Sequence, residues 1–156
     1  MPEARGVYLL SPAHADGIRA LSAEPDVAAA AAMDGPLTPE EVAVYIAAAA
    51  KAREEGRSYI FVLTDGANVA GICRLIGVLG LPRLIVAIGR AYRGQGNGSF
   101  LVRHALEFAF EKLGLEQVTA TGACLNLMSQ FGLRSGGDAL SRDEWLRWRG
   151  AQGSDT

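Results

Sequence analysis

Apolar residues fall into short runs in the middle of the chain, and these runs predict β-strands. Residues 58–64 and 69–76 are rich in β-branched and aromatic side chains, and they flank Asp65-Gly66-Ala67-Asn68, which predicts a hairpin. Residues 84–88 form a third run, whose length and β-branched content are typical of a buried strand. Further strands are predicted at residues 7–10 and 117–121.

Helical periodicity appears between these strands. From residue 100 to 113 apolar side chains recur at helical spacing, charged residues occupy the other face, and Gly114 ends the segment. Thr38 and Glu41 form a capping box, which predicts a helix that continues to residue 55.

The N-terminal third is less regular. Ser11 as N-cap and Pro12 at the first helical position predict a helix that reaches about residue 23. Proline, glycine and aspartate interrupt residues 24–37, where we expect a loop with some helical content.

Composition narrows the function classes. A chain of 156 residues with 49% hydrophobic and 21% charged residues is typical of one globular domain, so we expect a single domain over residues 1–156. A net charge of −2 without a basic cluster argues against nucleic acid as the main ligand. No stretch approaches 18 apolar residues and no leader sequence is evident, so we expect no membrane partner and a cytoplasmic location. Cys73, Cys124, His14 and His104 lack the spacing of a metal site.

The stretch from Arg93 to Ser99 is the strongest functional candidate. It joins the strand at 84–88 to the following helix, and its glycines alternate at positions 94, 96 and 98. A glycine-rich turn before a helix presents free N–H groups and the positive end of the helix dipole, which favours a phosphate. The loop lacks the lysine of a P-loop and the glycine spacing of a dinucleotide fingerprint. The alternative is a turn that only joins the two elements.

Arg93-Gly94-Gln95-Gly96-Asn97-Gly98 also matches the pattern Arg/Gln-x-x-Gly-x-Gly/Ala. With the flanking residues 88–92 and 106–115, it resembles the acyl-CoA loop of the GNAT acetyltransferase superfamily, of the RimJ/RimL type. The predicted order of elements resembles that family over residues 7–133. The resemblance implies an α/β GNAT fold, in which helices flank a mixed central sheet, and acetyl-CoA as cosubstrate.

The resemblance also implies roles for individual residues. Backbone groups of Val86, Ala87 and Ile88 would pair with the pantetheine arm, and Asn126 would bind that arm as well. Ser129 would lie near the thioester sulfur as a proton donor. The pyrophosphate would bind the loop residues Arg93, Gly94, Gln95, Gly96, Asn97, Gly98 and Ser99.

The C-terminal end departs from the family pattern. The helix that carries Asn126 and Ser129 is about a turn short, and the terminal hairpin is missing. We therefore expect Trp145 and Trp148 to be partly exposed and this end to form a homodimer.

The sequence does not identify the general base. An amine must lose a proton before it attacks a thioester, yet residues 84–88 carry no carboxylate. Glu24, Asp26 and Asp34 lie in a segment that lines the acceptor cleft in relatives, although each is more often a solvated loop carboxylate. Likewise, His14 is more often a surface histidine than a base, and Cys124 a core thiol than a nucleophile.

The function implied is transfer of an acetyl group from acetyl-CoA to a primary amine, a protein N-terminus or a small amine, by direct attack. One alternative is a degenerate domain of the same fold, acting as an acyl-CoA sensor or protein-interaction module without turnover. A second is a regulator that binds a nucleotide with the same loop.

Overall fold

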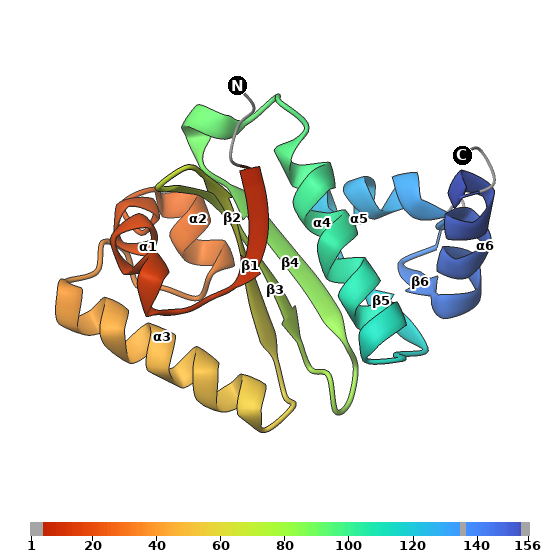
Figure 1. Cartoon of the computed structure of the whole chain (residues 1–156), viewed down its shortest axis with the longest axis horizontal. Coiled ribbons are helices and arrows are strands. Elements are labelled where there is room, and N and C mark those ends of the chain that lie inside the picture. The colour runs from red at the N-terminus through yellow and green to blue at the C-terminus, as the bar shows by residue number, and fades with distance from the viewer. Residues whose placement is uncertain (1–4, 135–136, 154–156) are drawn as a thin grey trace.

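The computed structural model describes residues 5–134 and 137–153. Its centre is a sheet with the strand order β1-β2-β3-β4-β5-β6 (Figure 1). Neighbouring strands are antiparallel except for the parallel pair β4 and β5. The sheet is therefore mixed, as the sequence predicted. The strands are β1 (Arg5–Leu9), β2 (Tyr59–Asp65), β3 (Asn68–Ile76), β4 (Arg83–Ile88), β5 (Gln117–Thr119) and β6 (Ala139–Ser141).

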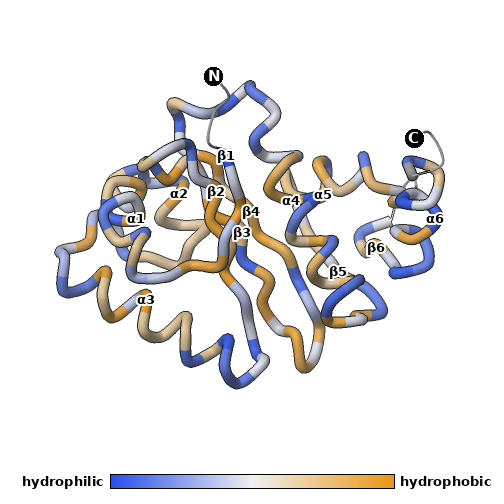
Figure 2. Tube along the Cα trace, in the orientation of Figure 1, coloured by the Kyte–Doolittle hydropathy of each residue, from blue (hydrophilic) through white to orange (hydrophobic). Residues whose placement is uncertain are grey.

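Helices cover both faces of the sheet, so the molecule has three layers (Figure 1). Figure 2 shows that the central strands are the most apolar part and that polar residues follow the outer helices. One face carries α1 (Ala15–Leu21), α2 (Pro25–Ala30) and α3 (Pro39–Glu54), and the other α4 (Asn97–Glu107), α5 (Gly122–Met128) and α6 (Arg142–Gly153). Shorter turns are the 3-10 helices Pro12–His14, Arg90–Tyr92 and Ser129–Phe131 and the π-helix Phe108–Lys112.

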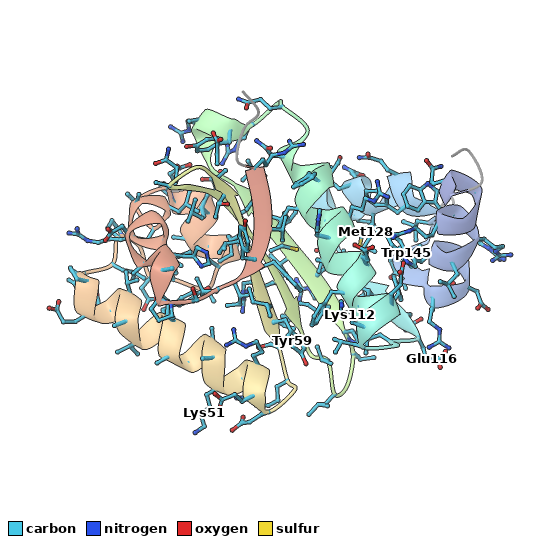
Figure 3. All side chains as sticks on the ribbon, viewed as in Figure 1. Lys51, Tyr59, Lys112, Glu116, Met128 and Trp145 are labelled. Carbon is cyan, nitrogen blue, oxygen red and sulfur yellow. The ribbon has the colours of Figure 1, made fainter. Side chains whose placement is uncertain are left out.

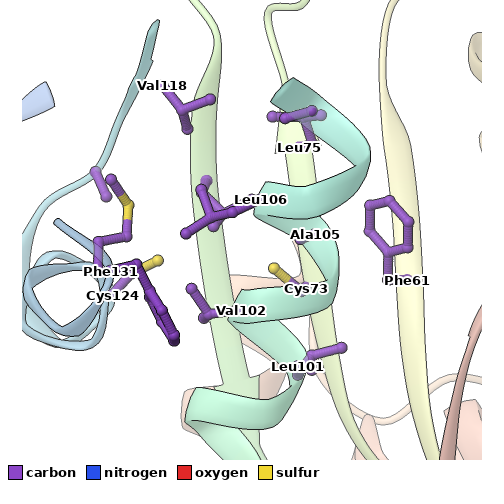
Figure 4. Packing of buried hydrophobic residues seen from close by; sticks show 14 of the residues in the cluster. Phe61, Cys73, Leu75, Leu101, Val102, Ala105, Leu106, Val118, Cys124 and Phe131 are labelled. Carbon is purple, nitrogen blue, oxygen red and sulfur yellow. The ribbon is translucent and has the colours of Figure 1, made fainter. Parts of the chain in front are cut away.

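Each face has its own hydrophobic core. On the α4 face, Leu101, Ala105 and Leu106 pack onto Cys73 and Leu75 of β3 (Figure 4). On the opposite face, residues of α1, α2 and α3 pack against β2 and β3; these include Ile18, Val27, Ile46, Val62 and Ile72. The two cores hold the sheet between two layers of helices. The strand β4 contributes side chains to both cores.

The two helix starts predicted from the caps Ser11 and Thr38 are confirmed. Thr38 Oγ1 accepts from Glu41 N at 3.1 Å, and Glu41 accepts from Thr38 N at 2.8 Å. Ser11 also begins a capping box, but the partner at its third position is His14. The helix predicted to reach residue 23 is a 3-10 turn followed by α1, which ends at Leu21. The loop at 24–37 contains α2.

Two boundaries near the predicted loop differ from expectation. The helix α4 starts at Asn97 rather than at residue 100, so Asn97, Gly98 and Ser99 belong to its first turn. The strand β5 ends at Thr119 instead of residue 121, although Ala120 N still donates to Asp138 O, next to β6, at 3.3 Å.

At the C-terminal end, the prediction that Trp145 is partly exposed is wrong. A single strand, β6, and the helix α6 take the place of a terminal hairpin, and residues 135 and 136 of the link before β6 lie outside the described part. Trp145 was predicted to be partly exposed, but its exposed fraction is 0%. It packs against the rings of Phe110 and Phe131, near Met128 (Figure 3), and its Nε1 donates to Glu111 Oε2 at 2.7 Å. Trp148 is half-buried against Phe131.

Candidate active site

The strands β4 and β5 meet only where β4 begins and β5 ends. Within the described part of the chain they share one register pair, Arg83 with Thr119, whereas β4 pairs with β3 over its whole length. The half-buried residues Val86, Ala87 and Ile88 therefore lie where β4 has lost its β5 neighbour. An unpaired strand edge can hydrogen-bond an extended ligand as an added strand.

The loop predicted from the sequence lies at the end of this opening. Gly94 has φ +75° and Gly96 has φ +80°, which are left-handed values that side chains resist. A Cβ added at either glycine would meet no atom within 4 Å, so the space before both is open. The hydrogen bonds of α4 begin where Phe100 N donates to Gly96 O at 3.1 Å. The N–H groups of residues 97–99 thus precede the helical ladder.

Gly98 has a different environment. A Cβ at this position would lie 3.0 Å from Leu127 Cδ1 and 3.8 Å from Ile88 Cγ1. Its lack of a side chain lets α5 pack closely on the first turn of α4 and the end of β4. Ser99 joins the same contact, because its Oγ donates to Gln130 Oε1 at 3.1 Å.

Side chains of the loop bind the protein itself. Gln95 Nε2 donates to Ala91 O at 3.2 Å. Asn97 is 6% exposed, donates from Nδ2 to Tyr92 O at 3.0 Å, and accepts from Arg5 Nη1 at 2.9 Å. These hydrogen bonds stabilise the loop conformation. Because the side chains are occupied, the backbone N–H groups of the loop are the donors that an anion could bind.

The side chain of Arg93 also binds groups of the protein itself. Its Nε donates to Ile88 O at 2.9 Å, and its Nη2 forms an ion pair with Asp26 of α2. The hydrogen bond from Arg93 lowers the pKa of Asp26 below its ordinary value. Glu24 accepts from Arg90 N at 2.8 Å. Two of the three candidate carboxylates of this segment therefore contact the connection between β4 and α4.

The two residues predicted on the short helix lie at the C-terminal end of α5. Asn126 is exposed. Ser129 is exposed and begins the following 3-10 turn, where its Oγ donates to Asn126 O at 2.6 Å. The Ser99–Gln130 bond brings this end beside the first turn of α4.

The remaining candidates are His14, Cys124 and Asp34, which lie outside the loop. His14 stacks on Tyr8, and burial lowers its pKa. Burial raises the pKa of the Cys124 thiol to about 12, and it raises that of Cys73 as well. Asp34 is exposed and lies away from the loop, beside Glu40 and Glu41 of α3. No group of three metal-ligating side chains occurs among the described residues.

Sequence reasoning missed residues that reach the loop from distant parts of the chain. Arg5 of β1 bonds Asn97, and its guanidinium lies 4.0 Å from the centre of the Phe100 ring. A cavity of about 600 Å³ lies beside this cluster and is lined by Arg5, Thr64, Asp65, Gln95 and Asn97 among others. No local pattern predicts these contacts, because 92 residues separate Arg5 from Asn97.

Comparison with known families identifies the chain. The family described as an acetyltransferase (GNAT) domain matches residues 7–135. The chain belongs to this family. The GNAT resemblance, the fold class and the enzyme class of acetyltransferase are thereby confirmed. No curated protein matches the sequence.

Solved structures of the same fold include three acetyltransferases. Ribosomal-protein-S5-alanine acetyltransferase from Vibrio fischeri has a TM-score of 0.76 at 14% identity, covering 93% of this GNAT chain and 97% of that one. Spermidine N-acetyltransferase from Vibrio cholerae, in complex with CoA and spermine, has a TM-score of 0.69 at 16% identity, covering 91% and 98%. RimL, a ribosomal L7/L12 α-N-protein acetyltransferase in complex with CoA, has a TM-score of 0.63 at 11% identity, covering 74% and 69%.

None of the helices described in this GNAT domain is long and apolar enough to cross a bilayer.

Proposed function

We propose that this GNAT domain transfers an acetyl group from acetyl-CoA to a primary amine by direct attack. The observation that carries the proposal is the open strand edge of β4 leading to the free N–H groups at the start of α4. In this arrangement the N–H groups of residues 94–99 bind the pyrophosphate. Backbone groups of Val86, Ala87 and Ile88 pair with the pantetheine arm.

The raised pKa values of the two cysteine thiols support direct attack. An acyl-enzyme route would need a cysteine thiolate, but burial holds the pKa of Cys124 at about 12 and raises that of Cys73. In the proposed step the amine nitrogen bonds to the thioester carbonyl carbon, the carbon–sulfur bond breaks, and CoA leaves as a thiolate that takes up a proton. The nitrogen loses a proton in the same reaction.

The departing thiolate needs a proton donor. Ser129 is proposed to protonate the thiolate and Asn126 to bind the pantetheine arm. For this the Ser129 hydroxyl must turn away from Asn126 O, which it bonds at 2.6 Å. Asp26 is a poor base, because Arg93 stabilises its ionised form.

The acceptor is proposed to be a protein N-terminus or a small amine. Solved structures of the same fold include a ribosomal-protein-S5-alanine acetyltransferase and a spermidine N-acetyltransferase. The test offers acetyl-CoA together with an alanine-initiated peptide, a serine-initiated peptide or spermidine, and detects the acetylated product by mass spectrometry. Product from any of the three supports the proposal.

The position of Ser129 favours a second candidate, a GNAT domain that binds acyl-CoA without turnover. Its hydroxyl is exposed and bonded within its own helical segment. Kinetics of Ser129→Ala separate the two. A fall in kcat with unchanged CoA affinity supports the proton-donor role, and unchanged turnover removes that role. CoA binding by the wild type without turnover of any amine favours the second candidate.

Two further proposals concern the whole molecule. We propose a homodimer through the C-terminal end and a cytoplasmic location. Burial of Trp145 removes one reason for the dimer, whereas the half-exposed Leu146 of α6 remains on that surface. Sedimentation velocity at tens of micromolar tests the dimer, and a monomeric mass contradicts it.

A further inference from the structure

Two contacts connect the end of β4 and the start of the loop to the N-terminal end of α2. One is the ion pair of Arg93 Nη2 with Asp26, and the other is the bond from Arg90 N to Glu24 Oε1 at 2.8 Å. Arg93 Nε also donates to Ile88 O at 2.9 Å, which ties its side chain to the end of β4. The Leu21 side chain also packs closely on the backbone of Gly89, because a Cβ on Gly89 would lie 2.9 Å from Leu21 Cδ2.

The short helix α2 depends on such contacts. It has six residues, and an isolated helix of that length is unstable in water. Its C-terminal end is held by Arg74 Nη1, which donates to Ala30 O at 2.9 Å, and by Tyr45 OH, which donates to Ala31 O at 2.8 Å. Its N-terminal end is held by the ion pair of Asp26 with Arg93.

Arg93 is therefore placed to connect two regions. Its guanidinium has five N–H donors, and the bonds to Ile88 O and Asp26 orient it across the gap between β4 and α2. The helix α2 packs against β4 on the face opposite α4. The GNAT resemblance implies that the segment containing α2 lines the acceptor cleft.

We infer that Arg93 is a positioning residue that fixes α2 as a wall of the amine site, and that it is not the main ligand of the pyrophosphate. This inference rests on the proposed function, since it concerns the site of the same reaction. The backbone N–H groups of residues 94–99 then provide the phosphate binding, and Arg93 acts on the acceptor through Asp26.

Four variants test the inference. Arg93→Gln removes the charge, and Arg93→Lys keeps the charge but lacks the fork that spans Ile88 O and Asp26. Asp26→Asn removes the partner. Arg90→Gln is the control, because it removes an exposed cation of the same connection whose side chain makes no hydrogen bond or ion pair among the described residues.

Hydrogen exchange of the α2 amides and calorimetric titration of CoA are measured on each variant. We expect α2 exchange to rise about two- to fivefold in Arg93→Gln, Arg93→Lys and Asp26→Asn, the range that a surface ion pair provides, and to be unchanged in Arg90→Gln. The double variant Arg93→Gln/Asp26→Asn should match the faster single variant. We expect the Kd of CoA to change less than about threefold in Arg93→Gln, as the pyrophosphate keeps its backbone donors.

A kinetic measurement adds a readout that general loss of stability would not produce. With the amine that the wild type acetylates, Arg93→Gln should raise the KM of the amine while the KM of acetyl-CoA stays within about threefold, as expected for lost acceptor positioning. A loss of CoA affinity of tenfold or more in Arg93→Gln, with unchanged α2 exchange, overturns the inference. Failure of the wild type to bind CoA instead overturns the proposed function, and the exchange data alone then decide whether Arg93 holds α2.

Discussion

Substitution of Trp145 tests whether the C-terminal helix α6 is part of the hydrophobic core. Its side chain is fully buried, lies 5.3–6.1 Å from the rings of Phe110, Phe131 and Trp148, and bonds Glu111. Replacing a buried tryptophan by alanine costs about 3–5 kcal/mol of unfolding free energy. For a domain of this size each kcal/mol lowers Tm by about 2–4 °C, so Trp145→Ala should lower Tm by about 6–20 °C.

The neighbouring residue provides the control. Leu146 is 47% exposed, so Leu146→Ala should cost less than about 1 kcal/mol. Trp145→Phe keeps an aromatic ring but removes the N–H that Glu111 accepts, and should cost about 1–3 kcal/mol. Thermal and urea unfolding followed by far-UV circular dichroism measure all three. A Trp145→Ala protein no less stable than Leu146→Ala would refute the argument that α6 is part of the core.

Three other predictions concern single residues. Gly132 has φ +100° and an added Cβ would lie 2.7 Å from Glu144 O, so Gly132→Ala should cost about 2–4 kcal/mol in urea unfolding; Gly35→Ala, at φ +116° in open space, should cost about 1–2 kcal/mol. The hydrogen bond from Ser141 N lowers the pKa of Glu144, so its stabilisation is present at neutral pH and is lost as the pH falls below the ordinary value of 4.5 and through the lowered pKa. The Tm deficit of Glu144→Gln should therefore shrink as the pH falls below 4.5, and a deficit that stays constant would contradict this. With a pKa of about 12, Cys124 is about 0.01% thiolate at pH 8, so native protein should react with a thiol reagent only on unfolding, and Cys124→Ala should keep its turnover.

Patterns of neighbouring residues were sufficient to predict much of the secondary structure. The β2–β3 hairpin, the Thr38 capping box and the strand before the loop depend on neighbouring residues, and the structure confirms all three. The start of α4 was missed because Gly98 resembles a turn residue. Its small size instead admits Leu127 from α5, which no local pattern indicates.

Long-range contacts account for the other differences. Trp145 appeared exposed because its partner Glu111 is 34 residues away on another helix. In the candidate site, the alternating glycines identified the loop, but not the direction of its side chains. Arg93 turns to Asp26, 67 residues earlier, and Asn97 to Arg5, 92 residues earlier. Such pairings depend on how the layers meet, and a single sequence does not specify that.

Calorimetric titration of acetyl-CoA tests the central claim most directly. The variant is Gly96→Asp, which places a side chain and a negative charge in the open space before the loop; its control is Gly56→Asp, at a left-handed glycine (φ +71° against +80°) with equally open surroundings after α3. We predict micromolar binding by the wild type and by Gly56→Asp, and none by Gly96→Asp. Unchanged binding by Gly96→Asp, or no binding by the wild type, would contradict the assignment of this loop to acetyl-CoA.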